Sequence, residues 1–201
     1  MDKMDKIKIA VLVSGGGTNL QALLDSDNPY GRVTLVIGGR SGIYALERAR
    51  LAGIKSMVIS SKKHGVGFGT ALIDALAAHD IGLVILAGYL TILPPEVVRT
   101  YDRRVINIHP ALLPSFGGVG MYGLRVHEAA LARGVKVSGA TVHYVNEIPD
   151  GGDIIAQKTV EVRPDDTPQT LQERVMREAE WVILPQAARD ICKRLLAEQR
   201  V

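Results

Sequence analysis

"IKIAVLVSGGGTNLQALLD", residues 7–25, contains the pattern that decides the fold. Its first part is a continuous apolar run, which is typical of a strand buried on both faces of a parallel sheet. A run of glycines follows, and the apolar residues then recur at helical spacing. A buried strand, a glycine loop and a helix in this order predict the first unit of a doubly wound α/β sheet.

Similar units continue to about residue 110, and a different pattern follows. There a helix precedes two strands joined by the turn PDGG, which favours an antiparallel pair, and Thr167 begins a long helix. The expected fold class is α/β: a Rossmann-like, doubly wound, mostly parallel sheet with an antiparallel C-terminal strand pair and a long C-terminal helix. The expected strands are 7–13, 32–39, 56–60, 81–88, 104–109, 138–145 and 153–162, and the expected helices are 18–25, 42–53, 69–80, 94–101, 124–134 and 166–199.

The composition excludes several classes of protein. The net charge is +3 without any run of Lys or Arg, so no nucleic acid partner is expected, whereas a small anionic substrate suits this charge. The single cysteine, Cys192, excludes an intrachain disulfide framework. The apolar stretches are too short and interrupted to span a membrane, and the N-terminus lacks a signal-peptide pattern. We expect one cytoplasmic domain over residues 1–201, either a monomer or a homodimer.

The glycine loop SGGGTN, residues 14–19, is a candidate phosphate site. Glycines allow several backbone N–H groups to point into one concavity, and the following helix adds the positive end of its dipole. Leu20 stands where a dinucleotide-binding motif needs a third glycine, so a monophosphate is favoured. The alternative is a tight strand-to-helix turn without a ligand. The predicted phosphate-binding residues are Gly16, Gly17, Thr18 and Asn19.

Asn107 and His109 form the strongest candidate catalytic pair. They are two residues apart at the end of a predicted strand, so both side chains point to the same side. This end of a parallel sheet is where ligands bind. An amide can stabilise an oxyanion and an imidazole can transfer protons, which together suit acyl transfer. The alternative for His109 is a partly buried histidine bonded to a backbone carbonyl.

Other polar residues give weaker signals. No serine or cysteine lies in a nucleophile elbow, so any acyl transfer is expected to be direct. No metal site is expected, because HEAAL at His127 lacks the second histidine of a zinc motif. His127 and His143 are predicted to be structural. Asp150, in PDGG, is predicted from local sequence to be a turn former.

Five stretches together resemble the phosphoribosylglycinamide formyltransferases, a family within the folate-dependent formyltransferase superfamily. They are VLVSGGGTNLQALLD, LAGYLTIL, NIHPALLPSF, SGATVHYVNEIPDGG and AEWVILPQA, and they occur in this order along nearly the whole chain. The resemblance implies transfer of the formyl group of the co-substrate 10-formyltetrahydrofolate to the amine of glycinamide ribonucleotide in purine biosynthesis, without a metal. It divides the domain into a nucleotide-binding half, 1–103, and a catalytic and folate-binding half, 104–201.

The resemblance also implies roles for individual residues. Asn107 would hold the oxyanion, His109 would be the protonated acid, and Asp150 would raise the pKa of His109. Glu180 would contact the ribose or amine side of the nucleotide. Arg177, one turn earlier, would reach the phosphate or would instead form a helical salt bridge with Glu180.

The folate would lie against the segment after the fourth strand and the loop before Asp150. Thr91 stands where many relatives have arginine, and the region for the folate tail has no arginine, so Lys62 or Lys63 would meet the tail. The loop at 115–123 differs from that of relatives. The implied folate-binding residues are Tyr89, Leu90, Thr91, Ile92, Leu93, Asn146, Glu147, Lys62 and Lys63.

Two other functions are kept as alternatives. A formyltetrahydrofolate hydrolase would share the Asn, His and Asp set, although such proteins usually carry an additional N-terminal domain. A non-catalytic nucleotide-binding module would bind phosphate without formyl transfer. A formyltransferase acting on initiator tRNA is disfavoured, since it would need a basic C-terminal domain.

Overall fold

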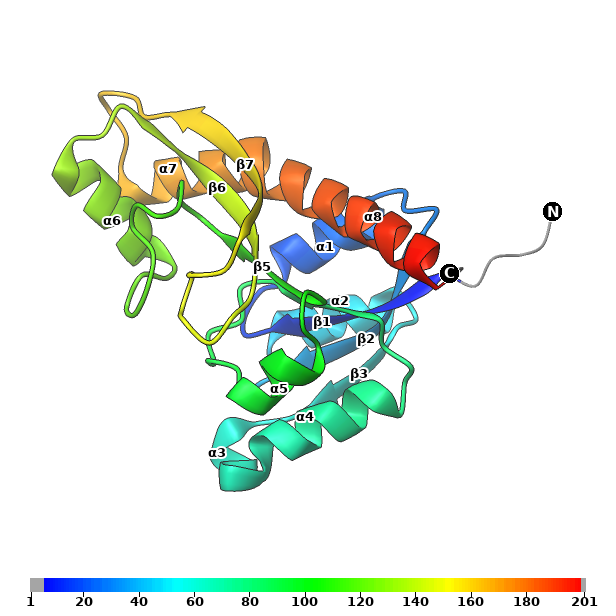
Figure 1. Cartoon of the computed structure of the whole chain (residues 1–201). Helices are drawn as coiled ribbons and strands as arrows, with labels where there is room; N and C mark the ends of the chain where they lie inside the picture. The colour runs from blue at the N-terminus through cyan, green and yellow to red at the C-terminus, as the bar shows by residue number, and fades with distance from the viewer. Residues whose placement is uncertain (1–5, 200–201) are drawn as a thin grey trace.

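The chain forms one seven-stranded sheet in the order β3-β2-β1-β4-β5-β6-β7 (Figure 1). The computed structural model describes residues 6–199. Strands β1 to β5 are parallel, and β6 and β7 continue the sheet in antiparallel orientation. The predicted fold class is confirmed. The strands are β1 (Ile7–Val13), β2 (Gly31–Gly38), β3 (Lys55–Val58), β4 (Leu83–Leu86), β5 (Val105–His109), β6 (Val137–Tyr144) and β7 (Ile154–Glu161).

Helices cover both faces of the sheet, which explains the continuous apolar runs of its strands. On β1, Val11 and Val13 pack into a core with α1, α2 and α8, whereas Leu12 packs into a second core with α4 and α5. The helices are α1 (Thr18–Asp25), α2 (Tyr44–Leu51), α3 (Ser61–His64), α4 (Phe68–Ala77), α5 (Pro95–Thr100), α6 (Leu124–Arg133), α7 (Pro168–Val175) and α8 (Trp181–Glu198).

The C-terminal helix departs from the sequence prediction. Thr167 caps it as expected, accepting a hydrogen bond from the Thr170 amide at 3.2 Å. However, the helix is divided by a π-helical turn, Met176–Glu180, between α7 and α8. A π-turn contains wider i→i+5 hydrogen bonds, so residues three apart no longer share one face. No helix in the described range is both long and apolar enough to cross a membrane.

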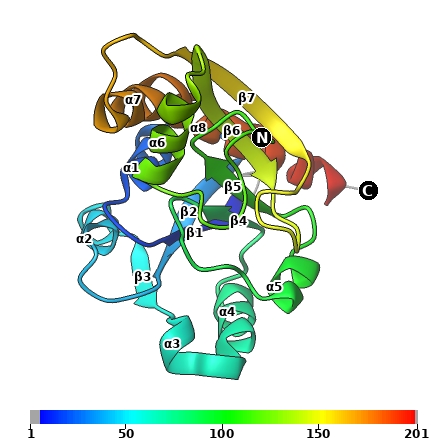
Figure 2. The same ribbon diagram turned by 90° about the vertical axis from the view of Figure 1, so that its left-hand side faces the viewer.

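The carboxyl ends of β1, β4 and β5 meet at one edge of the sheet, below α1 and beside α6 (Figure 2). The chain leaves β5 into the loop before α6 and returns along β6, antiparallel to β5. Strand β6 ends beside the start of β5, where the Val145 amide donates to the Val105 carbonyl at 2.9 Å, and the segment before β7 then folds back to the cavity edge of the sheet. Short helix α3, which the sequence pattern did not reveal, lies at the opposite end of the molecule from α7.

Candidate active site

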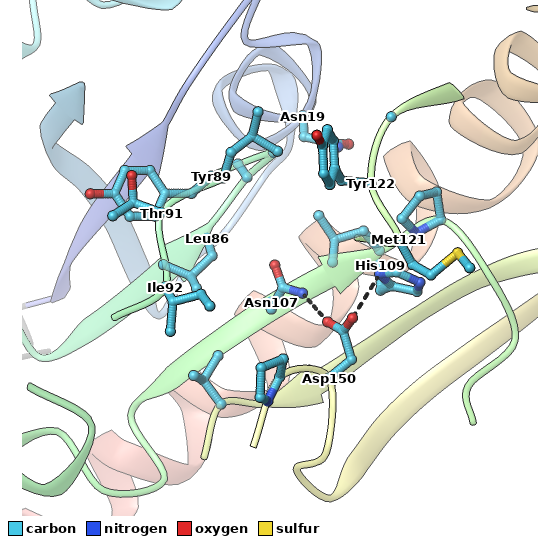
Figure 3. Close-up of a pocket in the computed structure, with 18 of the residues that line it drawn as sticks. Asn19, Leu86, Tyr89, Thr91, Ile92, Asn107, His109, Met121, Tyr122 and Asp150 are labelled. Atoms are coloured by element: carbon cyan, nitrogen blue, oxygen red, sulfur yellow. Dashed lines mark hydrogen bonds and ion pairs between the residues drawn. The ribbon is translucent and has the colours of Figure 1, made fainter. Parts of the chain in front are cut away.

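A cavity of about 430 Å³ occupies this edge of the sheet (Figure 3). Its walls come from the glycine loop, the ends of β4 and β5, the loop before α6, the β6–β7 turn and the π-turn. Ligand sites of open α/β sheets lie at this position. The structure brings most of the predicted site residues together in its walls: residues 16–19 and 89–93, with Asn107, His109, Asn146, Glu147, Asp150 and Glu180.

Asn107 and His109 project from one side of β5 into this cavity. In the antiparallel pairing with β6, Asn107 lies opposite His143 and His109 lies opposite Thr141. The His109 side chain is only 4% exposed, and its Nε2 lies 2.8 Å from the Phe116 carbonyl oxygen. A carbonyl can only accept, so Nε2 carries a hydrogen and Nδ1 is the nitrogen that faces Asp150.

Asp150 bridges the two side chains (Figure 3). Its Oδ2 lies 3.5 Å from His109 Nδ1, and its Oδ1 lies 3.5 Å from Asn107 Nδ2. The backbone N–H of Gly118 donates to Oδ2 at 2.8 Å. Asp150 also adopts a positive φ of 55°, so it is both a turn residue and a member of the polar group. The local turn interpretation was therefore incomplete.

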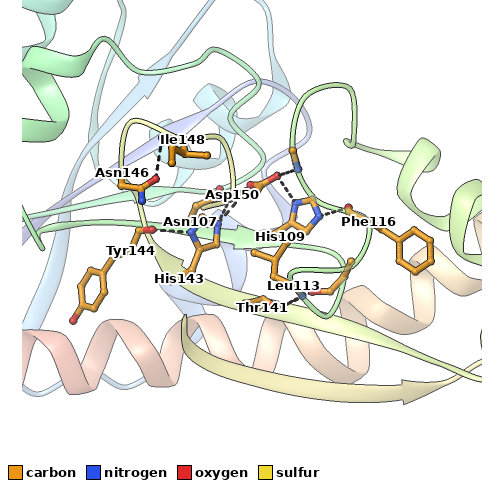
Figure 4. Close-up of polar contacts among 12 residues, drawn as sticks. Asn107, His109, Leu113, Phe116, Thr141, His143, Tyr144, Asn146, Ile148 and Asp150 are labelled. Atoms are coloured by element: carbon orange, nitrogen blue, oxygen red, sulfur yellow. Dashed lines mark hydrogen bonds and ion pairs between the residues drawn. The ribbon is translucent and has the colours of Figure 1, made fainter. Parts of the chain in front are cut away.

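His143 belongs to the same group, although sequence reasoning had made it structural (Figure 4). Its Nδ1 lies 2.7 Å from the Tyr144 carbonyl, so the neutral ring carries its hydrogen there. Nε2 then accepts from Asn107 Nδ2 at 3.1 Å and lies 3.5 Å from Asp150 Oδ1. This contact orients the amide of Asn107. Only the pairing register of β5 and β6 places His143 beside Asn107, and composition and residue spacing do not reveal that register.

The charges of Asp150 and His109 shift each other's pKa, but burial has the larger effect on the pKa of His109. Burial lowers the pKa of His109 below its ordinary 6.5, and the Asp150 charge and the Phe116 carbonyl oppose this without reversing it. Burial tends to raise the pKa of Asp150, but the charge of His109 and the hydrogen bond from the Gly118 amide bring it below its usual value. The charge of Asp150 raises the pKa of His109, in the direction that the resemblance implies, but burial outweighs it and the pKa lies below its ordinary value.

His127 is a second histidine of this wall. It is fully buried, and neither ring nitrogen has a hydrogen-bond partner among residues 6–199. Burial, with a smaller contribution from His109, lowers the pKa of His127 to about 4. The ring is therefore neutral near pH 7 and provides an uncharged polar surface behind His109.

The opposite wall contains a buried carboxyl. Glu180 is 5% exposed, and its Oε2 accepts a hydrogen bond from Asn19 Nδ2 at 3.0 Å. Burial raises the pKa of Glu180 to about 7, and the Asn19 hydrogen bond opposes this rise. Asn19 thus joins the first turn of α1 to the π-turn, and Glu180 changes charge near neutral pH.

Three predicted residues are not brought to the cavity. Arg177 is exposed and lines a separate surface depression with Arg163 and Glu173. It makes no salt bridge with Glu180, because the π-turn turns the two side chains to different faces. Lys62 and Lys63 are exposed on α3, outside the cavity wall. No group of three or more His, Cys, Asp or Glu side chains in the described chain is arranged to hold a metal ion.

The family model described as "Formyl transferase" matches residues 7–188. The chain belongs to the formyl transferase family. A solved structure of glycinamide ribonucleotide transformylase 1 from Symbiobacterium toebii is similar to it with a TM-score of 0.87 and 41% identity, over 94% of this chain and 88% of that chain. This similarity places the chain among the phosphoribosylglycinamide formyltransferases and confirms the resemblance found in its sequence.

Curated members of the formyl transferase family give the same assignment. The chloroplastic phosphoribosylglycinamide formyltransferase of Arabidopsis thaliana is 42% identical over 177 residues, which are 85% of this chain and 61% of that protein. The trifunctional purine biosynthetic protein adenosine-3 of Homo sapiens is 43% identical over 187 residues, 90% of this chain and 18% of that protein. The chain thus spans less than two thirds of these curated relatives.

Glu180 generates a prediction about stability and pH. In the folded protein its carboxyl keeps its proton up to about pH 7, whereas in the unfolded chain it ionises above about 4.5. The unfolded state therefore binds fewer protons between these values, so the free energy of unfolding falls as pH rises through this window. Glu180→Gln lacks this ionisation. Urea denaturation at about pH 5 and about pH 8 should show that wild-type protein loses stability relative to the variant at the higher pH. A stability difference that is the same at both pH values would contradict the assignment.

Proposed function

We propose that the protein transfers the formyl group of 10-formyltetrahydrofolate to the amine of glycinamide ribonucleotide. The observation that carries the proposal is the contact of one carboxylate, Asp150, with both Asn107 and His109. This group lies between a glycine loop and an apolar wall of the same cavity. Acyl transfer through a tetrahedral intermediate needs a hydrogen-bond donor for the oxyanion and a group that transfers protons. Asn107 is such a donor, His109 can transfer protons, and Asp150 stabilises the charged form of His109.

The apolar wall supports a flat, folate-derived co-substrate. Leu90, Ile92 and Ile148 line the cavity and are each more than 60% exposed. Exposed apolar side chains gathered at one site indicate a ligand surface. A pterin ring against these side chains would bring N10 of the folate, which carries the formyl group, toward Asn107. The glycine loop, at the other end, would take the phosphate of the nucleotide.

In the reaction, the substrate amine attacks the formyl carbon and a new C–N bond forms. The carbonyl oxygen becomes an oxyanion. One N–H of Asn107 donates to His143, and the other, which faces Asp150 Oδ1 at 3.5 Å, would turn to stabilise the oxyanion. The bond to N10 of the folate then breaks and N10 takes a proton from His109. The attacking nitrogen gives up one proton, which returns to His109, so the histidine is restored and the proton count is unchanged. Asp150 stabilises the charged form of His109, so the histidine can carry that proton although it is buried.

An assay of the purified chain tests the proposal. With glycinamide ribonucleotide and 10-formyltetrahydrofolate, we expect formylated nucleotide and tetrahydrofolate in equal amounts. Formate release without formylated nucleotide would instead identify a hydrolase. Absence of any folate turnover, with the nucleotide still bound, would identify a non-catalytic module.

The role of Asp150 has a matched test in Asp150→Asn and Asp153→Asn. Asp153 follows the same turn, but it forms an exposed ion pair with Arg103 at 3.0 Å and lies outside the cavity wall. The neutral amide introduced by Asp150→Asn would not stabilise a charged His109, so kcat should fall by about 10²–10⁴-fold. The Asp153 variant should retain wild-type turnover. Wild-type kcat in a folded Asp150→Asn protein would remove Asp150 from the mechanism.

A further inference from the structure

The glycine loop has no side chains from Gly15 to Gly17 that could fix its shape, and α2 fixes it instead. The Gly15 carbonyl accepts from the Ala45 amide at 3.1 Å. The Gly16 carbonyl accepts from Nε of Arg48 at 2.8 Å. Gly17 has a φ of +75°, and a Cβ there would lie 2.7 Å from the Cβ of Ala45. The loop is thus pressed against α2, with two consecutive carbonyls directed at this helix.

These two contacts decide where the amides of the loop point. In a planar trans peptide the carbonyl and the following N–H point in opposite directions. Because the carbonyls of Gly15 and Gly16 face α2, the N–H groups of Gly16 and Gly17 face away from it. The cavity lies on that side, since its wall contains residues 15–19 and none from α2. Neither amide donates to an acceptor within residues 6–199.

A buried side chain beside these amides also lacks a partner. Asn19, in the first turn of α1, is 8% exposed and lines the cavity (Figure 3). Its Nδ2 donates to Glu180, but its Oδ1 has no partner in the described chain. A buried polar atom is rarely left in this state, so a bound molecule with O–H or N–H groups is expected next to it.

The Arg48 side chain joins α2 by hydrogen bonds to both the glycine loop and α1. Besides Gly16, it donates from Nη1 to Oε1 of Gln21 at 2.9 Å, and its Cζ lies 4.9 Å from the centre of the Tyr44 ring. It forms no ion pair with any carboxylate of residues 6–199. The positive charge beside the loop is therefore not neutralised. Its neighbour Arg50 differs, because it is exposed and paired with Glu47 at 2.6 Å.

We propose that Arg48 is a positioning residue for recognition of a phosphate monoester by the glycine loop. Its hydrogen bond to the Gly16 carbonyl keeps the Gly17 amide directed into the cavity, and its free charge favours an anion there. Arg48 does not touch the ligand, since it lies behind the loop. Only the identity of the nucleotide rests on the proposed function. Binding of a simple phosphate monoester tests the role of Arg48 independently of formyl transfer.

The test compares Arg48→Met with Arg50→Met in the full chain. Calorimetry with ribose 5-phosphate should show about tenfold weaker binding to Arg48→Met, because the unpaired positive charge is lost and the Gly17 amide is no longer held toward the phosphate. Ribose, which lacks the phosphate, serves as the uncharged probe and should not discriminate between the proteins. In the formyl transfer assay, KM for the nucleotide should rise by a similar factor, whereas kcat and KM for the folate should change little. Arg50→Met should match wild-type protein in every measurement.

The possible failures are distinguishable. Equal ribose 5-phosphate affinity in wild-type and folded Arg48→Met protein would overturn the proposal, and so would a wild-type protein that does not prefer ribose 5-phosphate to ribose. If Arg48→Met does not fold, Arg48→Gln replaces it. This variant keeps an N–H donor and loses the charge, so weaker phosphate binding would support the role of the Arg48 charge and equal affinity would overturn it. If the wild-type protein shows no formyl transfer but Arg48→Met still binds ribose 5-phosphate more weakly than wild-type protein, the role of Arg48 is supported and only the proposed reaction is overturned.

Discussion

The carboxylate of Asp150 lies where three separate segments of the chain meet. It comes from the β6–β7 turn, accepts from the amide of Gly118 in the loop before α6, and contacts His109 at the end of β5. Strand β6 runs antiparallel to β5 and ends beside its start, where the Val145 amide donates to the Val105 carbonyl at 2.9 Å, so the segment after β6 must fold back along β5 to place Asp150 beside His109. The folding back of this segment, held at Asp150 by the Gly118 amide, is therefore the constraint on which the polar group depends.

The cavity has different chemistry on its two sides. Near the glycine loop, Arg48 contributes an unpaired positive charge, whereas Glu180 is buried with a pKa of about 7. A nucleotide phosphate beside Glu180 would favour the neutral carboxyl further, because two negative charges in a poorly solvated site repel each other. The other side is lined by the apolar residues of the β4–α5 segment. An anionic substrate and a flat co-substrate would thus meet at Asn107.

Much of this could be predicted from the sequence because it depends on local patterns. The apolar runs predicted the strands, and the position of Asn107 and His109 at a strand end placed them at the ligand edge of the sheet. His143 could not be found in this way, because its contact with Asn107 depends on the register between two strands 36 residues apart at these positions. The error on Arg177 has a similar cause, since its face depends on a π-turn that helical spacing does not reveal. The sign of the pKa shift of His109 depends on burial, a property of the whole fold.

The central claim is that Asp150 stabilises the protonated form of His109 within a buried site. The most direct measurement is an NMR titration of the His109 ring nitrogens in wild-type and Asp150→Asn protein. The pKa of His109 should be lower in the variant, because the opposing effect of the carboxylate is removed while burial remains. An unchanged or higher pKa of His109 in Asp150→Asn would show that Asp150 does not stabilise the protonated ring.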